Sequence, residues 1–258
     1  MGIAIIDKTA SYDPAKCIGK IVPVMSGLKI LHFGGDTVSL NQVIDGDPVT
    51  RVGSPVRVDS YSSSYSAGNY VRSVDVFNAD EGTFLLTPRL NVQASGQAAL
   101  IGTWPIGRGV SVINVMAGTT AAIWLAARTT KSDNSAALLS AIMVFNSLTT
   151  VTDPATAPYA FLVGRWYRDS AGLLQLDLKD LTHSLSAVAS GAAGQIVTAP
   201  QSTDFIGIGA SDGSSASSGG NANVQAFAAY YNRRLTDSEV GLIYEYVRSY
   251  MSRRGISI

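Results

Sequence analysis

The sequence predicts an all-β protein: an antiparallel β-sandwich that ends in one helix. Two observations predict this fold. Short apolar runs recur along the chain between clusters of Gly, Ser, Asp and Pro, a spacing typical of sandwiches rather than of alternating strands and helices. Only the C-terminal stretch has the 3.6-residue periodicity of a helix. With 258 residues, the chain is long enough for one large β domain.

Residues 1–26 stand apart from the rest of the chain. They hold charged residues around short apolar runs, together with two prolines. We interpret this segment either as an arm that docks on a neighbouring subunit or as a first edge strand, and the composition leaves both open. The sandwich itself is predicted over residues 27–258.

Several strands can be placed along the chain. Residues 109–118 and 121–128 carry apolar side chains on both faces, as strands inside a sandwich do, and residues 141–145 are similar. A hairpin is predicted from residues 161–168 and 173–179, joined by a short Asp-to-Gly loop. Its second arm alternates leucine with polar residues, so one face is expected to be buried and the other exposed.

The C-terminal helix is predicted over about residues 237–253. Thr236 and Glu239 have the spacing of a capping box, in which each side chain accepts a hydrogen bond from the other residue's backbone N–H. Arginines near the end of the helix suit its dipole, and Gly255 is a natural stop. The residues at helical spacing form one apolar stripe that must pack on the sandwich: Val240, Ile243, Tyr244, Val247, Tyr250 and Met251.

The composition excludes several classes of function. Charged residues make up 15% of the chain, and 19 basic residues balance 19 acidic ones. A nucleic-acid-binding protein needs a basic footprint, so nucleic acid is not an expected partner. No stretch approaches the roughly 18 unbroken apolar residues of a membrane span, so no membrane insertion is expected. A neutral, charge-poor surface favours association, and we expect a homo-oligomer or a subunit of a larger assembly.

Candidate catalytic groups are scarce. Glycoside hydrolysis needs two positioned carboxylic acids, but the chain has three glutamates, Glu81, Glu239 and Glu245, two of them on the predicted helix. His32 is interpreted as a strand residue satisfied by its surroundings, and His183 as a solvent-facing turn residue. A single cysteine excludes an intrachain disulfide and a cysteine metal site. We therefore predict that the protein has no catalytic residue and is not an enzyme. A glycoside hydrolase or lyase is the less favoured alternative.

A stretch rich in Tyr, Ser, Gly and Asn, residues 59–70, is the candidate ligand-binding site. Exposed aromatic rings there would stack on sugar rings while polar side chains bind hydroxyls. The alternative is a strand whose tyrosines pack on protein, and the sequence leaves the two open. Trp124 and Trp166 lie in apolar strands and are expected in the core. The tentative binding residues are Tyr61, Tyr65, Asn69, Tyr70 and, in a separate loop, Trp104.

The C-terminal stretch carries a resemblance to a known family. Residues 224–240, VQAFAAYYNRRLTDSEV, resemble the last strand and helix of laminin-G-like jelly rolls, which belong to the concanavalin A-like class. Two weaker matches precede it in the expected order: residues 205–210 resemble the penultimate strand, and residues 168–176 resemble the central hairpin. The resemblance implies a concanavalin A-like jelly roll over residues 27–258.

The resemblance also implies the one cofactor worth considering. Laminin-G-like domains often hold calcium at the rim of the sandwich through Asp, Asn and backbone carbonyls. Asp36, Asp45 and Asp47 are the weak calcium candidates here, with Asp59 further along the same turn-rich region. The preferred interpretation is that these aspartates form Asx turns, which need no metal.

Standalone chains of this kind resemble tail or other virion proteins of phages and prophages. The N-terminus lacks the basic start and long apolar stretch of a secretion signal, so we expect synthesis in the host cytoplasm and a final place in the virion. The expected function is a non-enzymatic tail or receptor-binding component that recognises a host surface glycan and contacts other virion subunits. The alternative is an architectural subunit, such as a capsid decoration or baseplate protein, that binds only protein.

Overall fold

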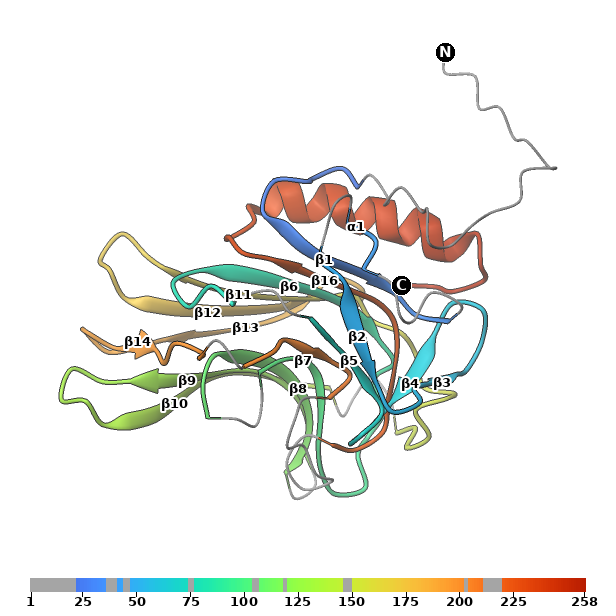
Figure 1. The fold of residues 1–258 in the computed structure, drawn as a ribbon, viewed down its shortest axis with the longest axis horizontal. Coiled ribbons are helices and arrows are strands. Elements are labelled where there is room, and N and C mark those ends of the chain that lie inside the picture. The colour runs from blue at the N-terminus through green and yellow to red at the C-terminus, as the bar shows by residue number, and fades with distance from the viewer. Residues whose placement is uncertain are drawn as a thin grey trace, which may run out of the picture.

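Two eight-stranded antiparallel sheets stack face to face, and one helix lies on the outside of the first sheet (Figure 1). This computed structural model describes residues 22–35, 41–43, 47–73, 77–103, 107–117, 120–145, 150–201, 204–210 and 220–258. The predicted fold class, an all-β sandwich with one C-terminal helix, is confirmed. Most of the predicted N-terminal arm, residues 1–21, lies outside the described residues.

The first sheet, called sheet A, contains the strand that carries the C-terminal sequence motif. Its order is β13 (Leu185–Ser190), β12 (Leu174–Asp180), β11 (Leu162–Arg168), β6 (Gly82–Pro88), β16 (Asn223–Tyr231), β4 (Ser63–Tyr65) and β3 (Val56–Arg57), with β1 (Leu28–Phe33) also paired to β16.

The second sheet, called sheet B, contains the strands predicted in the middle of the sequence. Its order is β10 (Ala136–Val144), β9 (Thr120–Thr130), β8 (Val110–Ala117), β7 (Gly96–Gly102), β15 (Gly207–Ile208), β5 (Tyr70–Ser73) and β2 (Val49–Val52), with β14 (Ile196–Val197) also paired to β9. The chain passes repeatedly from one sheet to the other, for example between β6 and β7 and between β10 and β11, as in a jelly roll.

The main core lies between the two sheets. Trp166 is completely buried there, stacked on Phe77 with ring centroids 4.9 Å apart, and its indole N–H donates to the carbonyl of Asn78 at 2.9 Å. The prediction for Trp166 is therefore confirmed. Trp124 differs: its strand neighbours point into the core, so its own side chain points to the opposite face of sheet B. It is only partly buried and packs in a small separate cluster with Ile113 and Val115.

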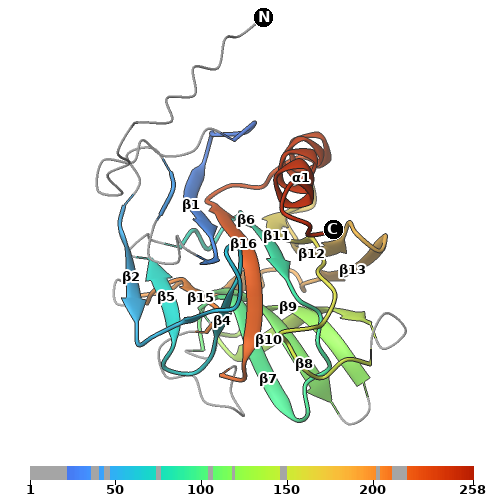
Figure 2. The ribbon, with the colours of Figure 1, turned by 90° about the vertical axis from the view of Figure 1, so that its right-hand side faces the viewer.

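A second apolar cluster lies on the outer face of sheet A, under helix α1 (Asp237–Ser252). Figure 2 shows α1 lying across this face beside β1, β16 and β11. As predicted from its apolar stripe, the helix buries Val240, Ile243, Val247 and Met251. The capping box of Thr236 and Glu239 is also confirmed: both reciprocal hydrogen bonds are present.

The helix changes the burial of the predicted hairpin. Strands β11 and β12 pair as expected, and the alternating leucines of β12 are buried in the core. On the opposite face Asp177 was expected to be exposed, yet only 6% of it is, because α1 covers this face. Arg165 on β11 compensates it: its Nε donates to the Asp177 carboxylate at 3.0 Å.

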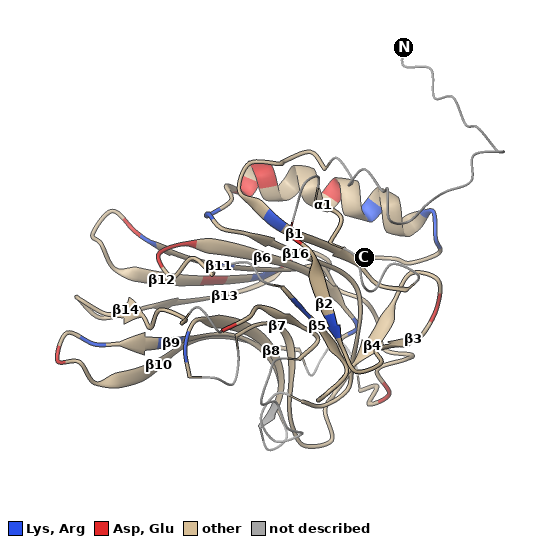
Figure 3. Cartoon of the chain, viewed as in Figure 1, with Lys and Arg blue, Asp and Glu red and all other residues tan. Residues whose placement is uncertain are grey.

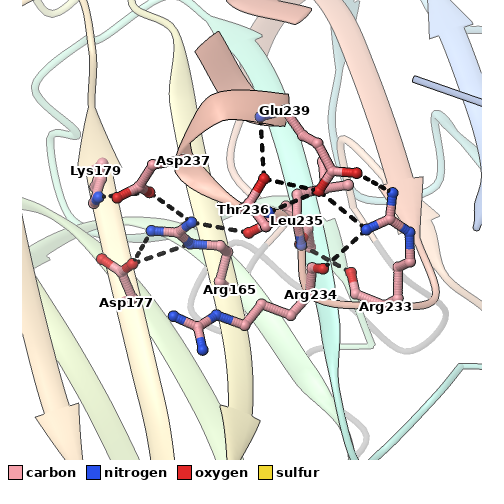
Figure 4. A network of polar contacts seen from close by, with 10 residues as sticks. Arg165, Asp177, Lys179, Arg233, Arg234, Leu235, Thr236, Asp237 and Glu239 are labelled. Atoms are coloured by element: carbon pink, nitrogen blue, oxygen red, sulfur yellow. Dashed lines mark hydrogen bonds and ion pairs between the residues drawn. The ribbon is translucent and has the colours of Figure 1, made fainter. Parts of the chain in front are cut away.

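The start of α1 is fixed by polar contacts to these two strands (Figure 4). Arg165 also donates to the carbonyl of Leu235 at 3.0 Å and pairs with the Asp237 carboxylate at 2.7 Å. Lys179 pairs with the same carboxylate at 3.0 Å, and these two cations lower the pKa of Asp237, Lys179 having the larger effect. The network occupies most of the charged side chains around the helix start, so it serves the fold.

Candidate ligand-binding cleft

A cleft of about 590 Å³ opens at the end of sheet A that lies beside the C-terminal end of α1. Five parts of the chain meet there: the loop between β3 and β4, the residue after β6, the segment before β11, the turn after β12 and the residues after α1. The ionisable and aromatic side chains that line it are Asp59, Tyr61, Arg89, Tyr159, His183 and Arg254.

Strand pairing brings Arg89 and Tyr159 together. Beyond the ends of β6 and β11, the two residues form an isolated antiparallel bridge, flanked by backbone hydrogen bonds from Leu90 to Pro158 at 2.7 Å and from Ala160 to Pro88 at 3.0 Å. The guanidinium of Arg89 lies 4.4 Å from the centroid of the Tyr159 ring, a distance typical of a cation–π contact. The arginine is therefore held flat against the tyrosine.

The Arg89 guanidinium makes one hydrogen bond within the described part of the chain, from Nη1 to the carbonyl of Ala157 at 3.1 Å. Its Nη2 lies 4.0 Å from the Asp59 carboxylate, which is too long for a hydrogen bond. Its Nε is buried and has no partner among the described residues. The donors of this side chain that remain for a ligand are therefore on its Nη atoms.

Tyr159 adds a second group without a partner. The side chain is 8% exposed, and its hydroxyl is buried without a hydrogen bond among the described residues. A buried polar group left unsatisfied costs about 1–3 kcal/mol. A hydrogen-bond partner for this hydroxyl, such as a bound water, would therefore stabilise this wall of the cleft.

Arg254 lies across the cleft from the strands, just after the end of α1. Its guanidinium lies 3.5 Å from the Tyr250 ring centroid and 5.1 Å from that of Tyr61. Its Nη1 donates to the carbonyl of Tyr250 at 2.8 Å, and its Nε is buried without a partner among the described residues. Gly255 follows in the left-handed conformation, with φ of 74°, and ends the helix as predicted.

Tyr61 is positioned by an Asx turn. The carboxylate of Asp59 accepts hydrogen bonds from the Tyr61 backbone N–H at 2.7 Å and from the Ser62 hydroxyl at 2.8 Å. The predicted Asx-turn interpretation is confirmed for Asp59. Both oxygens of this carboxylate are therefore occupied, and its turn holds the partly buried Tyr61 side chain at the cleft.

His183 closes one side of the cleft and is less free than expected. Its Nδ1 lies 2.7 Å from the carboxylate of Asp180, which is completely buried and also accepts backbone N–H bonds from Thr182 and His183. The expectation that His183 simply faces solvent is wrong, because only 24% of its side chain is exposed and its ring contacts Asp180. His32 is the buried strand histidine that the sequence predicts, with Nε2 2.9 Å from the hydroxyl of Tyr65.

Of the predicted binding residues, Tyr61 lines the cleft, but Tyr65 and Tyr70 do not. Tyr65 is completely buried and Tyr70 is 3% exposed, so the idea that they form an exposed stacking surface is wrong. Tyr65 points from β4 into the core and packs against Gly209, and this burial raises the pKa of its hydroxyl. Asn69 is used in a turn, where its Oδ1 accepts from the Ser54 backbone N–H at 2.9 Å. Trp104 lies outside the described residues.

The calcium candidates are only partly described. Asp36 and Asp45 lie outside the described residues, while the carbonyl of Asp47 accepts a hydrogen bond from Asn41 at 2.8 Å. In the part of the chain that the structure describes, no group of three or more His, Cys, Asp and Glu side chains is arranged to hold a metal ion. Within the same part, no helix is long and apolar enough to span a membrane.

No pattern in the sequence predicted Arg89, Tyr159 and Arg254 as residues of a binding site. They lie up to 165 residues apart and meet only through the pairing of β6 with β11 and the docking of α1. No local pattern marks them, because Arg89 and Arg254 follow the ends of β6 and α1, Tyr159 precedes β11, and each is an isolated residue. Tyr61 was found because its surroundings have the composition of a recognition loop.

Comparisons with known proteins support the fold. No protein-family model matches the sequence, and no curated protein matches it. Among solved structures, the binding domain of botulinum neurotoxin serotype D aligns with a TM-score of 0.55 and 11% identity over 86% of this chain and 51% of that one. The binding domain of botulinum neurotoxin DC in complex with SialylT aligns with a TM-score of 0.54 and 7% identity, over 86% of this chain and 51% of that one. Trypanosoma rangeli sialidase in complex with sialic acid aligns with a TM-score of 0.50 and 16% identity, over 91% of this chain and 35% of that one.

This chain spans about half the length of the two toxin domains and about a third of the sialidase. At such low identities, the likeness shows a shared β-sandwich fold.

Proposed function

We propose that this chain is a non-enzymatic carbohydrate-binding protein, and that it serves as a receptor-binding component of a phage or prophage virion. The cleft at the end of sheet A carries the first part of the proposal. It combines tyrosine rings with arginines that have unused hydrogen-bond donors, at Tyr61, Tyr159, Arg89 and Arg254. Concave sites with aromatic walls and a few fixed polar groups are typical of small-ligand recognition.

Each part of the cleft has a role in holding a sugar. The Tyr61 ring offers an apolar face for a pyranose, and the guanidinium groups of Arg89 and Arg254 donate to its oxygens. A single shallow site of this kind binds weakly, so useful affinity requires several copies acting together. We propose that the chain works as a homo-oligomer.

The lining of the cleft also favours binding over catalysis. Its one carboxylate, Asp59, already accepts hydrogen bonds from Tyr61 and Ser62. Glycoside hydrolysis needs two carboxyl groups, one on each side of the scissile bond. Two structures that share the fold were solved with SialylT and with sialic acid, which supports a sugar as the ligand.

A glycan array probed with the multimerised protein tests the proposal. We expect binding to a defined set of glycans, and Tyr61→Ala should weaken it at least tenfold because the stacking surface is lost. The matched control is Tyr167→Ala, which removes a tyrosine at the opposite end of β11. Thermal unfolding of each variant verifies that it is folded. If the wild-type protein binds no glycan, or if both variants weaken binding equally, the cleft is not a sugar site.

The virion role rests on the sequence resemblance and needs its own test. We expect mass spectrometry of purified particles to find the chain in a fixed stoichiometry, and labelled antibodies to place it at the tail tip. Detection only in the host lysate would contradict this role.

One observation favours the architectural alternative. Strand β10 exposes Leu138, Ile142 and Val144, with exposed fractions of 43%, 47% and 51%, at the edge of sheet B. Such an apolar edge suits contact with protein. A chain that sits on the capsid or baseplate through this edge and binds no glycan would fit the architectural role.

A further inference from the structure

We infer that the cleft selects an acidic sugar and binds its carboxylate through Arg89 and Arg254. This inference rests on the proposed sugar-binding function and names the class of ligand that the site takes. It follows from the local charge, the free donors and the fixed orientation of the two guanidinium groups.

The charge of the cleft differs from that of the chain. The whole chain has a formal net charge of zero. In the cleft two arginines face one carboxylate, and both oxygens of that carboxylate, on Asp59, accept hydrogen bonds from its own turn. Arg89 lies 4.0 Å from Asp59, so an incoming anion would not have to break a hydrogen-bonded ion pair. The local excess of positive charge therefore favours an anionic group.

The two guanidinium groups have donors to spare. Each carries five N–H donors. Within the described residues Arg89 donates from Nη1 to the Ala157 carbonyl, while Arg254 donates from Nη1 to the Tyr250 carbonyl and also hydrogen-bonds to the Tyr250 side chain. The Nε of each is buried and faces away from the open cleft, so the donors that remain for a ligand are the unused N–H groups of Nη1 and Nη2. A carboxylate is the group whose two oxygens best match the forked geometry of a guanidinium. The unused donors therefore fit a carboxylate better than a neutral hydroxyl.

Both arginines are oriented before any ligand arrives. Arg89 is held over the Tyr159 ring at 4.4 Å, and Arg254 over the Tyr250 ring at 3.5 Å. Little side-chain freedom is then left to lose on binding, which favours affinity. The cleft, at about 590 Å³, is also far larger than a lone anion, and Tyr61 adds an aromatic wall. A carboxylate attached to a sugar ring uses all of these features.

Titration calorimetry with three probes tests the inference: 3′-sialyllactose, digalacturonic acid and neutral lactose. We expect at least one acidic probe to bind at least tenfold more tightly than lactose. Preference for 3′-sialyllactose identifies a sialic acid as the source of the carboxylate. Preference for digalacturonic acid identifies a uronic acid. Arg89→Gln should reduce this preference at least tenfold, while Arg168→Gln, an exposed arginine that likewise donates to one carbonyl, should not.

A measurement on the wild-type protein keeps the inference testable if Arg89→Gln does not fold. Methyl esterification of the preferred acid should weaken its binding at least tenfold. Equal affinity for the acid, its ester and lactose would overturn the acidic-sugar inference and leave the sugar-binding function intact. Failure of all three probes, together with a blank glycan array, would contradict both.

Discussion

Arg165 and Asp177 depend on each other because both are nearly completely buried. Their exposed fractions are 2% and 6%, and one oxygen of Asp177 has no hydrogen-bond partner among the described residues. Removing one member of a buried ion pair leaves an uncompensated charge and costs about 3–5 kcal/mol, whereas replacing both by apolar residues is often tolerated. A single substitution in this pair should therefore destabilise the protein more than replacement of both residues.

We expect Arg165→Met to lower the free energy of unfolding by about 3–5 kcal/mol. The double variant Arg165→Met/Asp177→Leu should recover at least half of that loss, although the carbonyl of Leu235 also loses its donor. Urea unfolding followed by circular dichroism measures both. Lys179→Met is the control: its side chain is 28% exposed and pairs with the exposed Asp237, so its removal should cost less than about 1 kcal/mol. If the loss in the double variant equalled the sum of the losses in Arg165→Met and Asp177→Leu, the two residues would not be coupled.

Helix α1 is the element that the sequence predicts best. Its capping box, apolar stripe and terminal glycine are all local signals, and each is found where it was expected. The short strands β4 and β5 were harder to predict, because three or four residues show too little alternation to reveal which side is buried. Serines around Tyr65 suggested exposure, yet Ser62 and Ser63 are completely buried too.

The cleft could not be predicted for a different reason. Its residues come from five elements, and their meeting depends on strand pairing across long sequence separations. The register of β6 against β11 alone connects residues about 80 positions apart. Composition located Tyr61, but it contains no information about which distant arginines face that tyrosine.

The cap of α1 should make the stability of the protein depend on acid. The Arg233 guanidinium, with further hydrogen bonds from Thr236, lowers the pKa of Glu239 to about 2. An unfolded glutamate titrates near pH 4.3. A depressed folded pKa adds stability that is complete above the unfolded value and is lost as the pH falls toward 2.

We therefore expect the melting temperature to fall between about pH 4.5 and 2. Glu239→Gln should be less stable than wild type at pH 7 but should lose less stability on acidification, since its cap no longer titrates. Calorimetry at pH 7, 4.5, 3 and 2 measures the difference. Glu245→Gln removes a glutamate from the same helix outside the capping box and serves as the control. Parallel curves for wild type and Glu239→Gln would contradict this role of the cap.

Over the part of the chain that the structure describes, charged residues are sparse on both sheets (Figure 3). The consequence is clearest at the edge of sheet B, where β10 pairs with β9 and the sequence of β10, AALLSAIMV, contains no charged residue. Proteins usually protect an edge strand with charges, prolines or bulges, because its unpaired backbone groups otherwise accept another strand. This edge has neither charge nor proline.

We expect the chain to self-associate through β10. Burial of Leu138, Ile142 and Val144 against a second copy removes apolar surface from water, which favours association. Because the formal net charge is zero, electrostatic repulsion between copies is weak. Sedimentation velocity from about 1 to 100 µM should show oligomers, and Ile142→Lys should shift them toward the monomer by burying a charge in the contact. Leu242→Lys changes an equally exposed leucine on α1 and should leave the distribution unchanged.

The outcome also bears on how the cleft would work. A monomeric wild-type chain over this range, or an equal effect of both lysine variants, would contradict an interface at β10. If the oligomer is lost in Ile142→Lys while each cleft remains intact, binding of a soluble monovalent sugar should not change. Binding to a surface that displays many copies of the sugar should fall at least tenfold, because the linked sites no longer act together.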